Sequence, residues 1–108
     1  MSALIDLLRE MLMSRLPLYK NNSKTAAKIQ QFGVYADQLK LHIADGDVLS
    51  FISAFTTMTD FNVGHCVRRQ PTENKADVDQ YRTMVIRLWY QIHVKVKAGL
   101  VRMQMVVK

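Results

Sequence analysis

The sequence has few of the residues that cross-link a chain or bend it sharply: one cysteine, two prolines and four glycines among 108 residues. A single cysteine excludes an internal disulfide, so apolar burial or a partner chain must hold the fold together. The glycines are spread along the chain, and none precedes the Lys-Ser/Thr pair of a phosphate-binding loop. These absences exclude a disulfide-rich secreted domain and argue against nucleotide hydrolysis.

Long apolar runs are also missing. No stretch approaches the roughly 18 consecutive apolar residues that a membrane-spanning helix needs. Asp6, Arg9 and Glu10 interrupt the N-terminal segment where a secretion signal needs an unbroken apolar stretch. The 49% of hydrophobic residues excludes a disordered chain. We therefore expect one globular domain, residues 1–108, that is cytoplasmic and has no membrane contact.

Metal-ligating and catalytic residues are few. The soft and imidazole side chains are His42, His65, Cys66 and His93, of which only His65 and Cys66 are neighbours. Adjacent residues of an extended strand point to opposite faces, so this pair is poorly placed to chelate an ion. A Cys66 nucleophile with His42 or His93 as its base lacks any supporting motif. The sequence predicts no metal, no cofactor and no enzymatic activity.

Positive charge is concentrated in one part of the chain. The 15 Lys and Arg residues against 9 Asp and Glu give a net charge of +6. Residues 61–108 alone hold nine basic and three acidic side chains, whereas residues 41–60 hold three acidic and no basic ones. Such an excess attracts phosphate backbones or acidic protein faces. The alternative is that the charge serves solubility alone.

Apolar residues recur at helical spacing in four segments. We expect the first helix to run from Ser2 toward Pro17 and the second from Ser23 to a stop at Asp45-Gly46. Asp47 begins a short third helix, and Asn74 caps a fourth from about Lys75 to about Tyr90. The connection 58–71 has no regular pattern and reads as a long loop, with room for a short extended piece.

The C-terminal segment changes period. Ile92, Val94 and Val96 alternate with polar residues, and a similar alternation follows Gly99. Alternation on both sides of a glycine is typical of a β-hairpin, here with Gly99 in the left-handed region of its loop. Continuation of the fourth helix is the competing interpretation. The predicted fold class is mainly α (α+β): a small four-helix domain with a C-terminal β-hairpin.

The predicted hairpin suggests a binding surface. His93, Lys95 and Lys97 would share one face of its first strand, Arg102 would join them from the second, and Trp89 or Tyr90 could stack on an exposed base. The alternative is an edge strand whose lysines face the solvent and prevent aggregation. The residues expected to contact phosphates are Arg68, Arg69, Arg82, Arg87, Lys95, Lys97 and Arg102.

The function expected from these features is that of a small non-enzymatic nucleic-acid-binding or regulatory protein, with DNA and RNA both open as partners. The alternative is an adaptor or inhibitor that docks on an acidic partner protein. Seven methionines offer adaptable apolar surface, although filling of the core is the alternative role for each of them, and the first helix has a wide apolar face. A homodimer is therefore expected under either interpretation.

Overall fold

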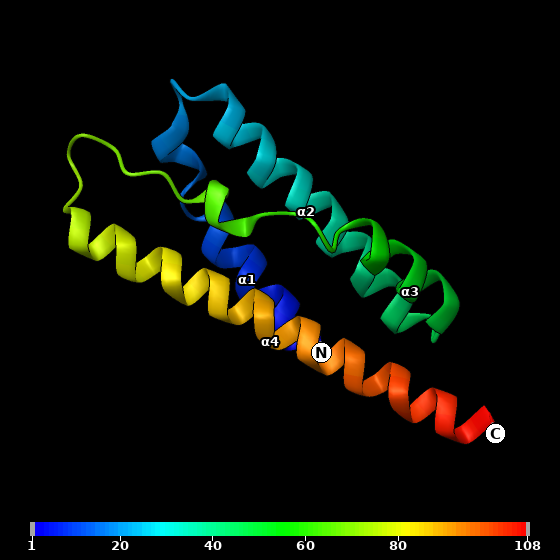
Figure 1. Cartoon of the computed structure of the whole chain (residues 1–108). Helices are drawn as coiled ribbons and strands as arrows, with labels where there is room; N and C mark the ends of the chain where they lie inside the picture. Colours follow the sequence, from blue (N-terminus) through cyan, green and yellow to red (C-terminus); the bar gives the residue numbers. More distant parts are fainter. Residues whose placement is uncertain (1, 108) are drawn as a thin grey trace.

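The computed structural model describes the backbone of residues 2–107 and the side chains of residues 2–99. The described chain contains four α-helices, two short 3-10 helices and no strand (Figure 1). In chain order these elements are α1 (Ser2–Met13), η1 (Leu16–Tyr19), α2 (Ser23–Ala44), α3 (Val48–Thr57), η2 (Val63–Cys66) and α4 (Lys75–Val107).

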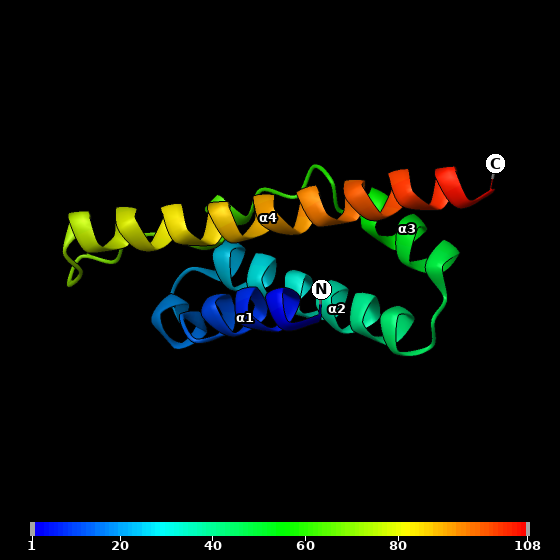
Figure 2. The same ribbon diagram turned by 90° about the horizontal axis from the view of Figure 1, so that it is seen from below.

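The helices form an elongated body of 55 × 23 × 21 Å. Helix α2 runs antiparallel to α1, and α3 turns back beside the end of α2 (Figure 1). Helix α4 lies along the other side of the molecule and packs against α1 (Figure 2). Residues 58–74, which we call the return segment, run back over the body from the end of α3 to the start of α4 (Figure 1). Helix η2 lies within this segment.

Helix ends follow the predicted capping residues, with one shift. The side chain of Asn22, rather than that of Ser23, accepts a hydrogen bond from the Thr25 amide and caps α2. Gly46 has a φ of 66° after α2, a conformation that glycine adopts at little cost. Asn74 accepts hydrogen bonds from two amides in the first turn of α4, as its sequence position predicted.

The core contains aromatic side chains from several elements. Phe32 of α2 is buried and packs edge-on against Trp89 of α4, with ring centroids 5.5 Å apart. It also contacts Phe61 of the return segment at 5.7 Å. These contacts join α2, α4 and the return segment, so they fix the position of the surfaces described below.

The predicted β-hairpin is wrong, because residues 92–107 continue α4. Two of the positions that suggested alternation, Ile92 and Val96, also continue a four-residue helical spacing from Leu88, and all three residues are buried. Val94, which the alternation paired with them, is 48% exposed. Gly99 does not adopt positive φ, so the predicted hairpin loop does not form. The sequence has no proline after Pro71, so every residue of this segment keeps the backbone N–H that a helix needs.

Within the described residues, no helix is long and apolar enough to cross a membrane.

Candidate nucleic-acid interface

Basic side chains from separate parts of the chain surround a hollow of about 480 Å³ beside the first turn of α2. Asn22, Thr25 and Gln70 complete its lining, and no described acidic residue contributes to it. Its positively charged residues are Lys24, Lys28, Arg68, Arg69 and Arg82. We call this site the basic hollow.

Helix α2 contributes two of these charges. Lys24 and Lys28 are four residues apart, so they lie one above the other on the same helix face. The first turn of α2 contains no acidic residue, so no side chain there offsets the positive end of the helix dipole. Two lysines close to this end repel each other and the dipole. An anion bound in the basic hollow would relieve that repulsion.

The backbone of the return segment is anchored where it borders the basic hollow. The Tyr19 hydroxyl accepts a hydrogen bond from the Arg68 amide at 2.7 Å and donates one to the Arg68 carbonyl at 2.9 Å. From the other side, Nε and Nη2 of Arg82 donate to the Val67 carbonyl at 3.1 and 2.8 Å. The exposed side chains of Arg68 and Arg69 therefore extend from a fixed backbone.

Two nearby carboxylates are already paired, Glu73 with Arg15 and Asp79 with Arg82 of the basic hollow. Glu73 accepts hydrogen bonds from Arg15 at 2.8 Å and from the Gln70 amide at 2.9 Å, and the Arg15 contact lowers the pKa of its carboxyl group. Asp79 pairs with Arg82 at 2.9 Å.

The remaining charges of the basic hollow are unneutralised. No salt bridge found in the described part of the chain involves Lys24, Lys28 or Arg68. Since the nearby acids are occupied, the hollow keeps a positive potential that suits phosphate groups.

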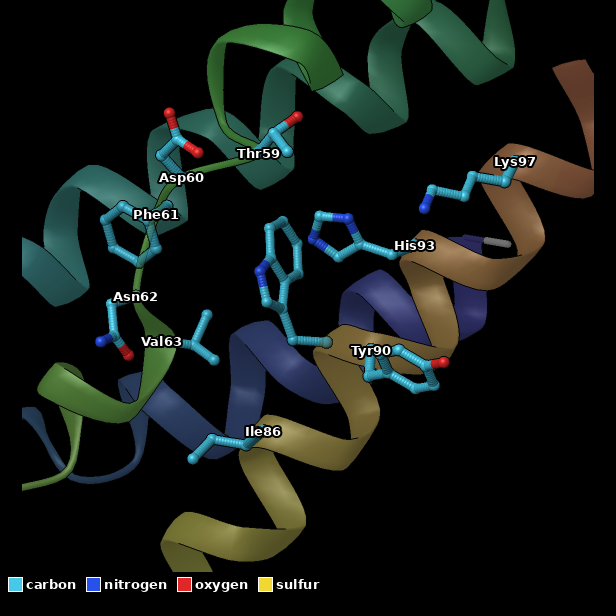
Figure 3. Close-up of a pocket in the computed structure, with 10 residues that line it drawn as sticks. Thr59, Asp60, Phe61, Asn62, Val63, Ile86, Tyr90, His93 and Lys97 are labelled. Carbon is cyan, nitrogen blue, oxygen red and sulfur yellow. The ribbon is translucent and has the colours of Figure 1, made fainter.

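A second depression, also of about 480 Å³, lies between α4 and residues 59–63 (Figure 3). We call it the aromatic groove. Phe61 approaches it from the return segment and Ile86 from α4, while the Lys97 side chain reaches back toward His93 (Figure 3). Its apolar and aromatic lining consists of Phe61, Val63, Ile86, Trp89, Tyr90 and His93.

His93 is held among other rings in this groove. Its imidazole lies edge-on to Trp89, with centroids 4.7 Å apart, and 4.9 Å from the ring of Phe55. Burial lowers the pKa of His93, and the positive charge of Lys97 lowers it further. A neutral imidazole adds an aromatic surface to the groove rather than a charge.

The two depressions lie on the same side of α4. Each residue turns a helix by about 100°, so Ile86, Tyr90 and His93 stand within about 80° of Arg82 around the axis. Arg82 lines the basic hollow, and Ile86, one turn later, lines the aromatic groove. Helix η2 packs on α4 between the two depressions. The contact is close, since a Cβ built on Gly64 would lie 3.2 Å from Cδ1 of Ile86. The two sites are therefore neighbours, separated by one turn of 3-10 helix.

The structure brings some of the residues predicted to contact phosphates together and places others on a different face of the molecule. It brings Arg68, Arg69 and Arg82 together in the basic hollow. Arg87 and Lys95 are exposed but stand about 140° around α4 from Arg82, on another face of the helix.

The proposed ribbon of basic residues does not exist. Lys95 and Lys97 are two residues apart in a helix and point about 160° away from each other, whereas a strand would have aligned them. Lys97 lines the aromatic groove instead. The side chain of Arg102 lies outside the described residues.

The residues predicted from the sequence to contact phosphates did not include Lys24 and Lys28. Their four-residue spacing next to an N-cap, in a first turn without acids, was the available signal. Their proximity to Arg68 depends on the path of the return segment, which no local pattern reveals.

Other chemistry finds little support in the described part of the chain. No three His, Cys, Asp or Glu side chains come close enough there to hold a metal ion. Cys66 is completely buried, and burial raises the pKa of its thiol to about 11. A thiol in this state is a poor nucleophile.

Comparisons of the chain with protein-family models, with curated proteins and with solved structures find no match.

Proposed function

We propose that this protein is a small, non-enzymatic nucleic-acid-binding protein that contacts phosphates through the basic hollow. The observation that carries the proposal is the convergence of five Lys and Arg side chains on one concave site. Arg82 is paired with Asp79, and none of the other four forms a salt bridge in the described part of the chain. Arg side chains form two-pronged hydrogen bonds with phosphate oxygens, and lysines add mobile charge. We place this function in the cytoplasm, where the single thiol stays reduced.

The test is a fluorescence-anisotropy titration against labelled duplex DNA, oligothymidylate and duplex RNA at about 50 and 200 mM salt. Binding that depends on several phosphate contacts should weaken roughly tenfold to a thousandfold across this range. The informative variant is Lys24→Glu/Lys28→Glu, which reverses two charges of the basic hollow. Its matched control is Arg87→Glu/Lys95→Glu, which makes the same change in net charge on another face of α4.

We expect the hollow variant to bind at least about tenfold more weakly than the wild type and to show a smaller salt dependence. The control variant should lose only the smaller, long-range part of the attraction. The absence of binding to any of the three probes at low salt would contradict the proposal. Equal losses in the two variants would show that net charge, and not the basic hollow, drives binding.

A second candidate is an adaptor that docks on a partner protein. Its support is a set of exposed apolar side chains at the turn between α2 and α3: Leu41 is 58%, Val48 45% and Leu49 78% exposed. Self-association through this turn would account for the expected homodimer. A Leu49→Ser variant should then lose partner or self-association while its binding to nucleic acid is unchanged.

A further inference from the structure

The aromatic groove exposes surfaces that a folded domain usually buries. Tyr90 is 68% and Ile86 46% exposed, and both stand at the rim of the groove. Beneath them lies Trp89, which is only 7% exposed and is held by Phe32 and Phe55. The groove therefore combines a rigid aromatic floor with accessible rings at its edge, an arrangement that suits a flat apolar ligand.

The charges of the groove restrict what can enter it. Asp60 and Lys97 are its two charged lining residues among those described, and they come from opposite sides (Figure 3). These two charges offset each other, so the groove lacks the excess of positive charge that the basic hollow offers to phosphates. A nucleobase is flat and uncharged, and the side chains of Thr59 and Asn62 offer hydrogen-bonding groups for its polar edge.

The spacing of the two sites suits one flexible strand. Arg82 and Tyr90 are eight residues apart on α4, or about 12 Å along its axis, and Lys97 lies about 10 Å farther. This distance is comparable with the span of a few nucleotides, the lower end of the site sizes seen for single-strand binders. A duplex keeps its bases stacked inside and cannot offer one to the groove.

We propose that this side of α4 binds a single-stranded nucleic acid, with its phosphates in the basic hollow and one of its bases against the rings of the aromatic groove. The inference rests on the proposed function and adds the kind of nucleic acid to it. Stacking of bases on aromatic side chains combined with a positively charged track is a common arrangement for binding single strands with little sequence preference.

Trp89 gives a direct readout, because it is the only tryptophan in the chain. The full-length protein is titrated with an oligothymidylate of about 20 nucleotides, with its duplex, and with an abasic oligonucleotide of the same length. The oligothymidylate should change the Trp89 fluorescence. The abasic strand should bind through its phosphates with little such change.

The variant Tyr90→Ala removes an exposed ring, so it should fold normally. It should weaken binding of oligothymidylate by about tenfold, with smaller effects on the abasic strand and the duplex. The control is Met84→Ala, which shortens a side chain that is 51% exposed on another face of α4. It should leave all three affinities within about twofold of the wild type.

The outcomes separate this inference from the proposed function. If the abasic strand binds as tightly as oligothymidylate, or Tyr90→Ala affects both equally, the groove does not hold a base although the basic hollow still binds phosphate. If none of the probes binds, both proposals fail. If Trp89 fluorescence changes with protein concentration alone, the groove is covered by a second copy of the chain and the inference is overturned.

Discussion

The hydroxyl of Tyr19 forms hydrogen bonds with both backbone groups of Arg68, although the two residues lie 49 positions apart. It also accepts a hydrogen bond from Nε of Arg15 at 3.0 Å. One donor and two acceptor sites are all that a phenol offers, so this buried hydroxyl is fully satisfied. It links η1 to the return segment at the point where that segment presents Arg68 to the basic hollow.

Replacing Tyr19 with phenylalanine should therefore affect both stability and binding. The Arg68 amide and Nε of Arg15 would lose their partner in a mostly buried place, at a cost of about 1–3 kcal/mol. Chemical denaturation measures the loss. Nucleic-acid affinity should fall by a few-fold, because Arg68 is no longer held in position. Tyr35→Phe, which removes a hydroxyl whose hydrogen bond is solvent-exposed, is the control and should change stability by less than about 0.5 kcal/mol.

The ion pair of Arg15 and Glu73 should make stability depend on pH in the acid range. The hydrogen bond from Arg15 lowers the pKa of Glu73 in the folded chain. The ionised carboxylate thus stabilises the folded state at neutral pH. This contribution is lost as the pH falls from the ordinary glutamate value of about 4.3 through the lowered folded value.

Glu73→Gln tests that dependence. At pH 7 the variant should be less stable by about 1 kcal/mol, because the hydrogen bonds with Arg15 and the Gln70 amide lose their charged partner. The difference from the wild type should shrink as the pH falls below about 4. A constant difference between pH 7 and pH 3 would show that the charge of Glu73 does not stabilise the fold. Glu10→Gln changes an exposed carboxylate and is the control.

Much of the helical fold could be predicted from the sequence because burial follows local spacing. The apolar series Ile29, Phe32, Ala36, Leu39 and Ile43 predicted the inner face of α2. The first four residues are buried, and Ile43 is partly buried against the same core. The C-terminal segment was predicted wrongly for two reasons. Valine favours strands, and the apolar residues of this segment fit both the two-residue repeat of a strand and the repeat of a helix. Packing of Ile92 and Val96 against the core decides between them, and that packing is a tertiary effect.

The candidate site was only partly predictable. The arginines at positions 68, 69 and 82 were identified from charge alone, but charge could not show which of them share a surface. Their grouping with Lys24 and Lys28 requires the return segment to lie beside the start of α2. Hydrogen bonds between residues far apart in the chain hold it there, and these have no signature in local sequence.

The helical assignment of the C-terminal segment leads to its own prediction at Gly99. A Cβ at this position would meet no atom within 4 Å, and its backbone does not require glycine. Gly99→Ala should therefore stabilise α4 by about 0.5–1 kcal/mol and increase the helical signal in circular dichroism. In a hairpin whose loop needs positive φ at this residue, the same change would be destabilising. A loss of stability would thus contradict the long helix.

Cys66 should be nearly inert toward thiol reagents in the folded chain. Its side chain is fully buried, and burial raises the pKa of its thiol to about 11. At pH 8 this shift alone lowers the thiolate population about a hundredfold relative to a free cysteine. Reaction with a disulfide reagent such as DTNB should be slow in buffer and rapid in denaturing guanidinium. Equal rates under the two conditions would show that Cys66 is accessible in the folded protein.

His93 should make the folded state sensitive to mild acid. Its folded pKa lies below the ordinary value of about 6.5, because burial and the nearby Lys97 disfavour the imidazolium ion. The unfolded chain therefore binds a proton more readily, and the folded state loses stability as the pH falls from about 6.5 through the folded pKa. His93→Phe keeps a ring against Trp89 and Phe55 but cannot take up a proton.

The measurement is the free energy of unfolding at pH 8, 6.5 and 5, for the wild type, His93→Phe and two lysine variants. The wild type should lose more stability between pH 8 and pH 5 than His93→Phe does. Lys97→Met should reduce the loss in part, because it removes the positive charge beside the imidazole. Lys95→Met removes the same charge from another face of α4 and should behave as the wild type. Identical pH dependence in the wild type and His93→Phe would mean that protonation of His93 is no harder in the folded chain than in the unfolded one.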